Sequence, residues 1–401
     1  MNYTLFDDTT RLSLLPFTHT RPIADIRCGI LTMRERWDLL LQQATTTLTA
    51  AYLQPVFPGN TIGDTLYING SVFATEALVK AINALQPDSY LIKDALIIAV
   101  RTNKELTFDT ITEQTKSLAS NTFDGEVHAL KNVWDIFQQN DRALRDDFKL
   151  LTSGKKSAPL PDGITVSGKE NLFIEEGANI YPGCIINATT GPVYIAKDTE
   201  VLEGTMIRGP LALCEHGVIK MGSKIYGATT IGPGCKVGGE INNAIFFANS
   251  NKAHDGYLGN AVIGEWCNLG ADTNCSNLKN NYDEVKIWDE HNFKSIGTGL
   301  TFCGLLMGDH SKCAINTAFN TGTVVGVSAN IFGSGFPEKF VPSFSWGGSD
   351  NITTYQLNRA METANRMMGR RNKKLSAAET EMYRHIFEAT EKQRTLFANS
   401  K

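Results

Sequence analysis

One polar segment of the chain carries the side chains best suited to acid–base chemistry. It runs from His254 to Asn277 and sets Tyr257 and Asn268 among glycines and aliphatic residues. An imidazole titrates near neutral pH, so His254 could remove a proton from a nucleophile under working conditions. A lone histidine in a loop is more often a surface residue, and asparagine at such positions is also ordinary turn chemistry. Both interpretations of the segment stay open at this level.

The elements that must position these side chains repeat every six residues. Neither a helix, with its period of 3.6, nor a simple strand, with its period of 2, explains that step. A small residue often comes four positions after a large one, and glycine often follows the large one directly. The pattern predicts a three-sided coil of about nine turns, stacked by parallel backbone hydrogen bonds. The unbroken aliphatic series is Ile195, Val201, Ile207, Leu213, Ile219, Ile225, Ile231 and Val237.

The chain divides into three predicted parts around this repeat. The repeat loses its register over 244–258 and 277–295, where we expect polar loops to leave the coil and carry function. Before the coil, alternating strand and helix patterns indicate an α/β layer structure, with strands at 65–69 and 95–100 and helices at 76–85 and 133–150. We therefore expect an α/β domain over 1–155, a β-coil over 164–345 and an α-helical tail over 351–401.

The helical tail contains a basic cluster and a cap signal. Arg370 and Arg371 lie close to two lysines, which is typical of a solvated helix end. Ser376 and Glu379 have the spacing of a capping box, so a second helix should begin there.

The composition excludes several classes of function. Lys and Arg number 38 against 42 Asp and Glu, and this net charge of −4 without a basic block leaves no footprint for nucleic acid or an anionic membrane surface. No apolar run is long enough to span a bilayer, and no leader pattern is present, so we expect a cytoplasmic protein. The eight cysteines include no CxxC pair and are expected to be buried thiols.

The segment after His254 resembles the acetyltransferase half of the bacterial bifunctional N-acetylglucosamine-1-phosphate uridyltransferase/glucosamine-1-phosphate acetyltransferase family. The matching parts are His-x-x-Tyr-Leu-Gly, Ile-Gly, Asn-x-Gly-Ala and the asparagine at 277. The resemblance implies a left-handed β-helix, a homotrimer, and acetyl-CoA bound in the groove between adjacent subunits. It assigns the following residues: His254 as general base; Tyr257, Asn268 and Asn277 as acceptor contacts; Ala271 as a backbone contact to the thioester; and Arg208 as a phosphate ligand.

Two positions depart from that family. Asn242 stands where the family has a phosphate-binding lysine, and Asp272 stands where it has glycine. Either another lysine compensates, or the acceptor amine is a different one. The candidates for compensation are Lys252, Lys279 and Lys286.

Residues 9–26 resemble a degraded sugar-nucleotidyltransferase signature. Arg11 and Arg21 could still hold the phosphate of UTP or of a UDP-sugar, although Asp7 and Asp8 replace the expected glycines. The strand at 65–69 ends in Asn69 and lacks the Asp that would bind a metal, so Mg²⁺ is expected only if this domain is active. We predict no resident metal.

These features favour an acetyl-CoA-dependent N-acetyltransferase that acts on an amino-sugar phosphate in nucleotide-sugar biosynthesis. Two alternatives stay open: a non-catalytic regulatory subunit that binds sugar nucleotides, and a protein with nucleotidyltransferase activity only. A zinc-dependent carbonic anhydrase of the β-helix class is set aside, because the seven histidines do not provide its pair five residues apart.

Overall fold

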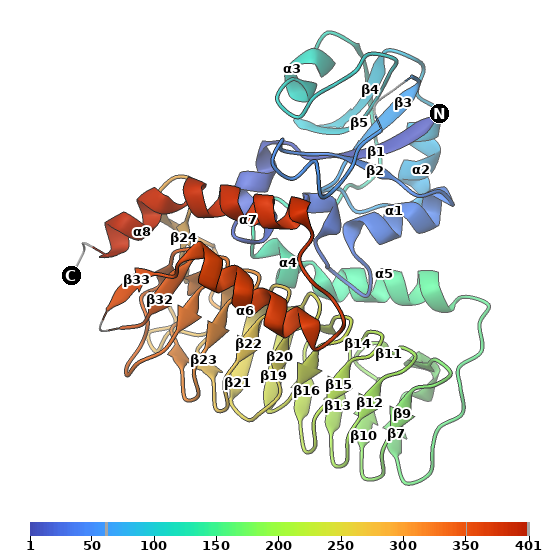
Figure 1. Cartoon of the computed structure of the whole chain (residues 1–401). Helices are drawn as coiled ribbons and strands as arrows, with labels where there is room; N and C mark the ends of the chain where they lie inside the picture. The colour runs from blue at the N-terminus through green and yellow to red at the C-terminus, as the bar shows by residue number, and fades with distance from the viewer. Residues whose placement is uncertain (61–62, 350, 399–401) are drawn as a thin grey trace. The chain divides into compact units, whose positions relative to one another are not determined.

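A computed structural model describes residues 1–60, 63–349 and 351–398 of the chain (Figure 1). The contacts divide the chain into two compact units. The first contains Met1–Ile26, Leu31–Val133 and Ala377–Met382, and the second contains Arg27–Ile30, Trp134–Ser376 and the chain from Tyr383 onward. Each unit has its own hydrophobic core.

The first unit is built on a six-stranded sheet in the order β2-β1-β3-β5-β4-β6. β1 is parallel to β2 and β3, whereas β5 is antiparallel to β3 and β4. The strands are β1 (Asn2–Phe6), β2 (Thr46–Leu48), β3 (Thr65–Asn69), β4 (Ser89–Lys93), β5 (Leu96–Thr102) and β6 (Ala119–Thr122). The helices are α1 (Met33–Leu41), α2 (Glu76–Asn83) and α3 (Ile111–Thr115), with short 3₁₀ helices at η1 (Thr9–Leu14), η2 (Phe17–His19) and η3 (Ile23–Asp25). The predicted strands at 65–69 and 95–100 and the helix at 76–85 are confirmed.

The single helix predicted over 133–150 is instead two helices, α4 (Asp135–Gln138) and α5 (Asn140–Thr152). Asn140 is fully buried at the point of division. Its side chain accepts from the Gly29 N–H at 2.7 Å and donates to the Ala228 carbonyl at 2.8 Å. Asparagine side chains compete in this way with helix formation, and partners distant in sequence leave no periodic signal.

The second unit is a three-sided parallel β-helix, as the six-residue step predicts. Its strands stack one coil on the next in three ladders, which we name faces A, B and C. Face A contains β7 (Thr165–Ser167), β10 (Ile185–Asn187), β13 (Met206–Arg208), β16 (Lys224–Tyr226), β23 (Asn274–Cys275) and β28 (Ala318–Phe319). Face B contains β8 (Leu172–Ile174), β11 (Val193–Ile195), β14 (Leu211–Leu213), β17 (Thr229–Ile231), β26 (Leu306–Met307), β29 (Val324–Val325) and β31 (Phe340–Val341).

Two longer strands bend from face A into face B, and a third face completes the prism. The bending strands are β19 (Glu240–Phe246) and β21 (Tyr257–Ile263). Face C contains β9 (Asn179–Ile180), β12 (Glu200–Val201), β15 (Val218–Ile219), β18 (Lys236–Val237), β20 (Asn251–Lys252), β22 (Asn268–Leu269), β27 (Lys312–Cys313), β30 (Asn330–Ile331) and β32 (Ser345–Gly347), to which β33 (Ile352–Thr354) adds antiparallel. In Figure 1 the labelled strands follow one another along a single axis from β7 to β32.

The six-residue positions point into the prism and form its core. Ile207, Ile225 and Ile241 face inward from successive strands of face A, each 3% exposed or less. All eight cysteines are free and buried, as predicted. Hydrophobic burial along the axis therefore holds the coils in register.

One of the two expected interruptions is wrong and the other is confirmed. Residues 244–258 stay in the coil, because β19 pairs with β21 along its length and Phe246 stands opposite Ile263. The coil shortens at its corners there, which shifts the six-residue register without expelling a loop. By contrast, β24 (Lys286–Asp289) and β25 (Lys294–Gly297) form an antiparallel hairpin that begins inside the predicted 277–295 interruption and ends two residues beyond it.

The tail contains α6 (Leu357–Gly369), α7 (Ala377–Ala389) and α8 (Glu391–Ala398). The predicted solvation of the basic cluster is wrong for Arg371, which is half-buried. Its guanidinium lies 5.7 Å from the centre of the Trp266 ring and donates to Asn249 Oδ1 at 2.6 Å. A cation can stack on an aromatic face that the sequence alone does not bring near it. Across the described ranges, no helix is both long and apolar enough to cross a membrane.

Candidate functional site

His254 stands at a corner of the β-helix, in the turn 253–256 that joins β20 on face C to β21 on face A. Its side chain is exposed. Asn251 pairs with Asn268 before this turn and Leu258 pairs with Cys275 after it. The two turns between these pairs have equal length and stack residue on residue, which places His254 next to Ala271. The structure therefore brings together the two residues expected at the acetyl transfer.

Tyr257 and Asn277 are also brought together, twenty residues apart in the sequence. Asn277 Nδ2 donates to Tyr257 Oη at 3.0 Å and to Asn260 Oδ1 at 2.7 Å. Asn277 and Asn260 are each 8% exposed, so these bonds form largely out of water and fix the phenol. Sequence reasoning missed Asn260. Its signal is an asparagine directly after Tyr-Leu-Gly, at a positive φ of 46° that asparagine tolerates.

Asn268 lies apart from that group. It precedes the inward Leu269 on β22, so it points outward from face C, between Asn251 and Lys312. Ala271 has its carbonyl occupied by the Asn316 N–H at 2.8 Å. Within one chain, the predicted acceptor contacts thus fall on two different faces of the prism.

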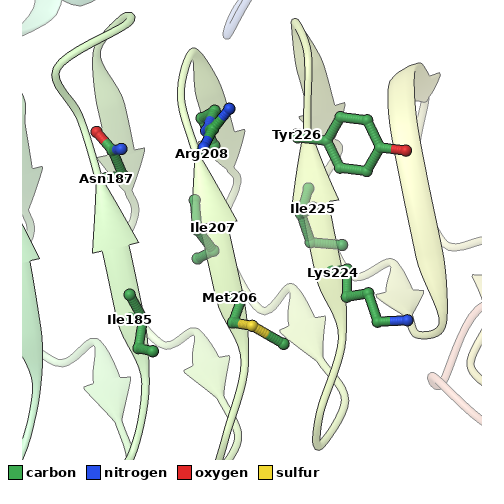
Figure 2. Close-up of a pocket in the computed structure, with 8 residues that line it drawn as sticks. All are labelled: Ile185, Asn187, Met206, Ile207, Arg208, Lys224, Ile225 and Tyr226. Carbon is green, nitrogen blue, oxygen red and sulfur yellow. The ribbon is translucent and has the colours of Figure 1, made fainter.

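Arg208 lines a groove of about 490 Å³ on face A (Figure 2). Figure 2 shows Asn187, Arg208 and Tyr226 in one row across successive strands, and Ile185, Met206 and Lys224 in the next row. The guanidinium of Arg208 is exposed and has no hydrogen bond or ion pair within the described part of the chain. From its strand β13 to β21, which begins at Tyr257, there are three strand steps, or about 14 Å.

Two further side chains of this groove escaped the sequence reasoning. Lys224 and Tyr226 flank the inward Ile225, and the positions on either side of an inward residue point outward, which is the signal that could have found them. Tyr226 Oη donates to Glu240 Oε1 at 2.7 Å, and Lys224 Nζ lies 3.7 Å from Glu240 Oε2. Burial and the Glu240 carboxylate raise the pKa of Tyr226, so its phenol stays protonated and can donate.

The three lysines considered as substitutes for the missing cation have different surroundings. Lys252 is 1% exposed and its ammonium donates to backbone carbonyls inside the coil, so it cannot reach a bound phosphate. Lys279 donates to the Glu284 carbonyl, and Lys286 is exposed on the β24 hairpin. Asn242 itself pairs with Tyr226 and with Gly259 on face A.

In the first unit, both predicted anion ligands are buried. Arg11 Nη2 donates to the Thr18 carbonyl at 2.7 Å and to Tyr52 Oη at 3.0 Å. Its Nε lies 3.6 Å from Asp7 Oδ2. Arg21 is 5% exposed. These contacts place Arg11 in the interior of the loop that follows β1.

The carboxylates at the carboxyl end of β1 are engaged by protein groups. Burial raises the pKa of Asp7 to about 6, against the opposite effect of Arg11. The Asp7 oxygens accept from the Ile23 N–H at 2.8 Å and from Thr49 Oγ1 at 2.6 Å. The Asp8 oxygens accept from the Thr10 N–H and from Asn69 Nδ2. With all four oxygens used in this way, the set does not fit a Mg²⁺ site.

No group of three His, Cys, Asp or Glu side chains that could hold a metal ion occurs in the residues that the structure describes.

Comparison with known proteins finds a family match for the amino-terminal part of the chain and partial matches to bifunctional proteins. Residues 3–156 match a family model described as sugar nucleotidyl transferase. The bifunctional protein GlmU of Synechococcus elongatus is 23% identical over 231 residues, which are 52% of this chain and 46% of that protein. A protein of Sulfurisphaera tokodaii, described as a bifunctional sugar-1-phosphate nucleotidylyltransferase/acetyltransferase, is 28% identical over 144 residues, 35% of each chain. The chain thus spans less than half the length of these relatives.

Among solved structures, LpxA of Bacteroides fragilis, a UDP-N-acetylglucosamine acyltransferase, aligns over 61% of this chain and 86% of its own. The identity is 14% and the TM-score is 0.30.

Proposed function

Because the chain is a GlmU-like protein, in which a region matching the sugar nucleotidyl transferase family precedes a hexapeptide β-helix, we propose that it transfers the acetyl group of acetyl-CoA to the amine of an amino-sugar phosphate, such as glucosamine 1-phosphate. The observation that carries this proposal is the corner of the β-helix where His254 lies exposed beside Ala271, just before the bonded pair Tyr257–Asn277. The reaction belongs to nucleotide-sugar biosynthesis.

The corner offers the groups that N-acetylation needs. The amine nitrogen attacks the thioester carbon, a C–N bond forms, and the C–S bond then breaks to release the CoA thiolate. His254 takes the proton that the nitrogen loses and can return it to the leaving thiolate. In this proposal Tyr257, held by Asn277, orients the sugar, and Arg208 with Lys224, farther along the same face, binds its phosphate.

The assembly that this proposal requires is a homotrimer, with acetyl-CoA lying between neighbouring prisms. Its support is the edge between faces C and A, which carries His254 and also exposes apolar side chains. Met221 and Ile315 are each 67% exposed there, and Tyr181 is 37% exposed. Exposed apolar residues on one edge favour its burial against a second copy, and that copy would bring its own Asn268 to the groove.

For the amino-terminal unit we propose that it binds a sugar nucleotide but does not transfer a nucleotidyl group. Arg11 is committed to Asp7, Thr18 and Tyr52, and the oxygens of Asp7 and Asp8 are occupied. The alternative for the whole chain is a non-catalytic regulatory subunit. The commitment of Arg11 and of the two carboxylates to protein groups favours this alternative.

The test measures release of free CoA thiol from acetyl-CoA in the presence of glucosamine 1-phosphate. His254→Ala should lower kcat by about 10²–10⁴-fold, the usual contribution of a general base. His216→Ala is the matched control, because His216 is also an exposed corner histidine of the β-helix, with φ of 57°. It should retain full turnover.

A wild-type protein that binds a UDP-sugar but releases no thiol with any amino-sugar phosphate would be a regulatory subunit, and the proposal would be wrong. Equal loss in the His254 and His216 variants would also contradict the role of His254.

A further inference from the structure

Lys252 occupies an inward position of the β-helix, where the preceding coils carry aliphatic side chains. Its strand β20 pairs in register with β18, so that Lys252 stands opposite Val237. The side chain is 1% exposed. Four methylene groups can fill the space of an aliphatic residue, but the ammonium at their end requires acceptors in the interior.

The ammonium ends at the corner that bears His254. Lys252 Nζ donates to three backbone carbonyl oxygens, at 3.3, 2.9 and 3.0 Å, those of Gly238, His254 and Asp255. Three N–H groups meet three acceptors, which is the full donor capacity of a lysine. Two of the acceptors belong to the turn from which the imidazole projects, and the third belongs to the corner of the preceding coil.

Neighbouring coils close the same corner with a hydroxyl group. The residue just before the face A strand is Thr205, Ser223 or Thr273, and each hydroxyl donates to the carbonyl three residues earlier, at 2.8, 2.5 and 2.7 Å. In the two coils between Ser223 and Thr273, the equivalent residues are Gly239 and Gly256. The ammonium of Lys252 supplies the donors that these two corners lack.

The glycines in turn allow the coils to approach closely around His254. A Cβ on Gly239, at φ of 80°, would lie 3.0 Å from the His254 carbonyl oxygen. A Cβ on Gly256, at φ of 110°, would lie 2.2 Å from the Thr273 carbonyl oxygen. The backbone of the turn is therefore set by one coil on each side and by Lys252 from within.

The charge of Lys252 persists at neutral pH. Burial lowers its pKa to about 8, while the carboxylates of Asp255 and Asp272 act in the opposite direction. The imidazole of His254 has no hydrogen-bond partner among the described residues, so its location depends on the backbone that the ammonium holds.

We propose that Lys252 is a positioning residue: its buried ammonium holds the turn 253–256 in the geometry that presents His254 to the reacting amine. This inference rests on the proposed acetyl transfer for its catalytic consequence, whereas the hold on the turn stands by itself. A misplacement of about 1 Å at a catalytic group can cost on the order of 10²-fold in rate.

The experiment compares Lys252→Met with Lys312→Met by amide hydrogen exchange and by kinetics. Methionine keeps the apolar stem and removes the donors. Lys312 is the matched control: burial lowers its pKa to about 8, and its Nζ donates to the His310 carbonyl at 2.7 Å. In the Lys252 variant, exchange across residues 253–258 should rise by about tenfold or more. In the same variant kcat should fall by about 10–100-fold with the KM for acetyl-CoA unchanged.

The exchange readout separates the two proposals. Faster exchange in the turn of Lys252→Met but not of Lys312→Met supports the hold on the turn, even if wild-type protein transfers no acetyl group. Unchanged exchange at 253–258, or an equal change in both variants, would overturn it. Should Lys252→Met not fold, Lys252→Gln replaces it in the comparison with Lys312→Met. Glutamine has a shorter stem and fewer N–H donors, so exchange at 253–258 should again rise, and unchanged exchange would overturn the proposal.

Discussion

Single residues at the candidate site divide into those held by partners and those left open to a ligand. The Asn277 amide nitrogen donates to both Tyr257 and Asn260, so it orients the phenol. Arg208 instead presents an exposed guanidinium in a groove floored by isoleucine and methionine. An exposed guanidinium suits an anion such as a sugar phosphate, because its fork can bind two phosphate oxygens.

Arg208→Ala should raise the KM for the phosphorylated acceptor by about 10–100-fold, since a hydrogen bond to a charged group contributes about 1.5–3 kcal/mol. The KM for acetyl-CoA should not change. Initial-rate kinetics with each substrate varied in turn provide the measurement. Lys236→Ala is the control, because Lys236 is an exposed cation on face C. If both variants behave alike, or if only the acetyl-CoA KM moves, Arg208 does not bind the acceptor phosphate.

At the scale of the element, the corner between faces C and A carries the candidate site, and it is closed differently there than in the neighbouring coils. Most of its turns place a serine or threonine directly before the face A strand, and its hydroxyl closes the turn. The His254 turn uses glycine and a lysine from the core. This exchange lets the main chain of one coil pack directly on the next, so the corner is both tightly packed and intolerant of added volume.

Gly256→Ala should destabilise the β-helix by about 2 kcal/mol more than Gly222→Ala. Both positions have positive φ, 110° and 65°. An L-residue at the φ of Gly222 incurs a backbone cost of about 1–2 kcal/mol, and at the φ of Gly256 it incurs at least as much. The Cβ on Gly222 would meet nothing within 4 Å, whereas the Cβ on Gly256 would collide with the Thr273 carbonyl. Urea unfolding of the two variants provides the comparison. Equal free energies of unfolding for the two variants would contradict this prediction, because the corner would then accommodate the added methyl group.

At the scale of the whole molecule, the proposed chemistry requires more than one chain. Asn268 lies on face C while Tyr257 and Asn277 lie on face A, so one prism does not enclose an acceptor. The exposed apolar side chains along the His254 edge fit a prism that packs against copies of itself.

We expect the protein to have three times its chain mass of 44.0 kDa in light scattering. The double variant Met221→Glu with Ile315→Glu should shift that mass toward one chain and abolish acetyl transfer, because buried carboxylates at an interface cost several kcal/mol. Leu396→Glu is the control, since Leu396 is 49% exposed on α8. A wild-type monomer, or a double variant that stays trimeric, would contradict this arrangement.

Much of the fold and part of the site follow from residue spacing. The six-residue series from Ile195 to Val237 predicts the prism because inward burial repeats once per side. The segment from His254 to Asn277 predicts a site because its polar residues alternate with the repeat and because it resembles a family of acetyltransferases. The prediction of an interruption over 244–258 was wrong, because shortened corners and an expelled loop shift the six-residue register in the same way.

Residue spacing alone predicts the three-sided coil, the α/β unit before it and the helices after it, because periodic burial is local and leaves a periodic pattern. Which polar side chains meet becomes visible only in the folded chain. The fold joined Tyr257 to Asn277, set Asn268 on another face, committed Arg11 to the interior and placed the Lys252 ammonium under His254. These outcomes depend on stacking between coils and on bonds between residues far apart in the chain. Such contacts produce no periodic pattern in the sequence.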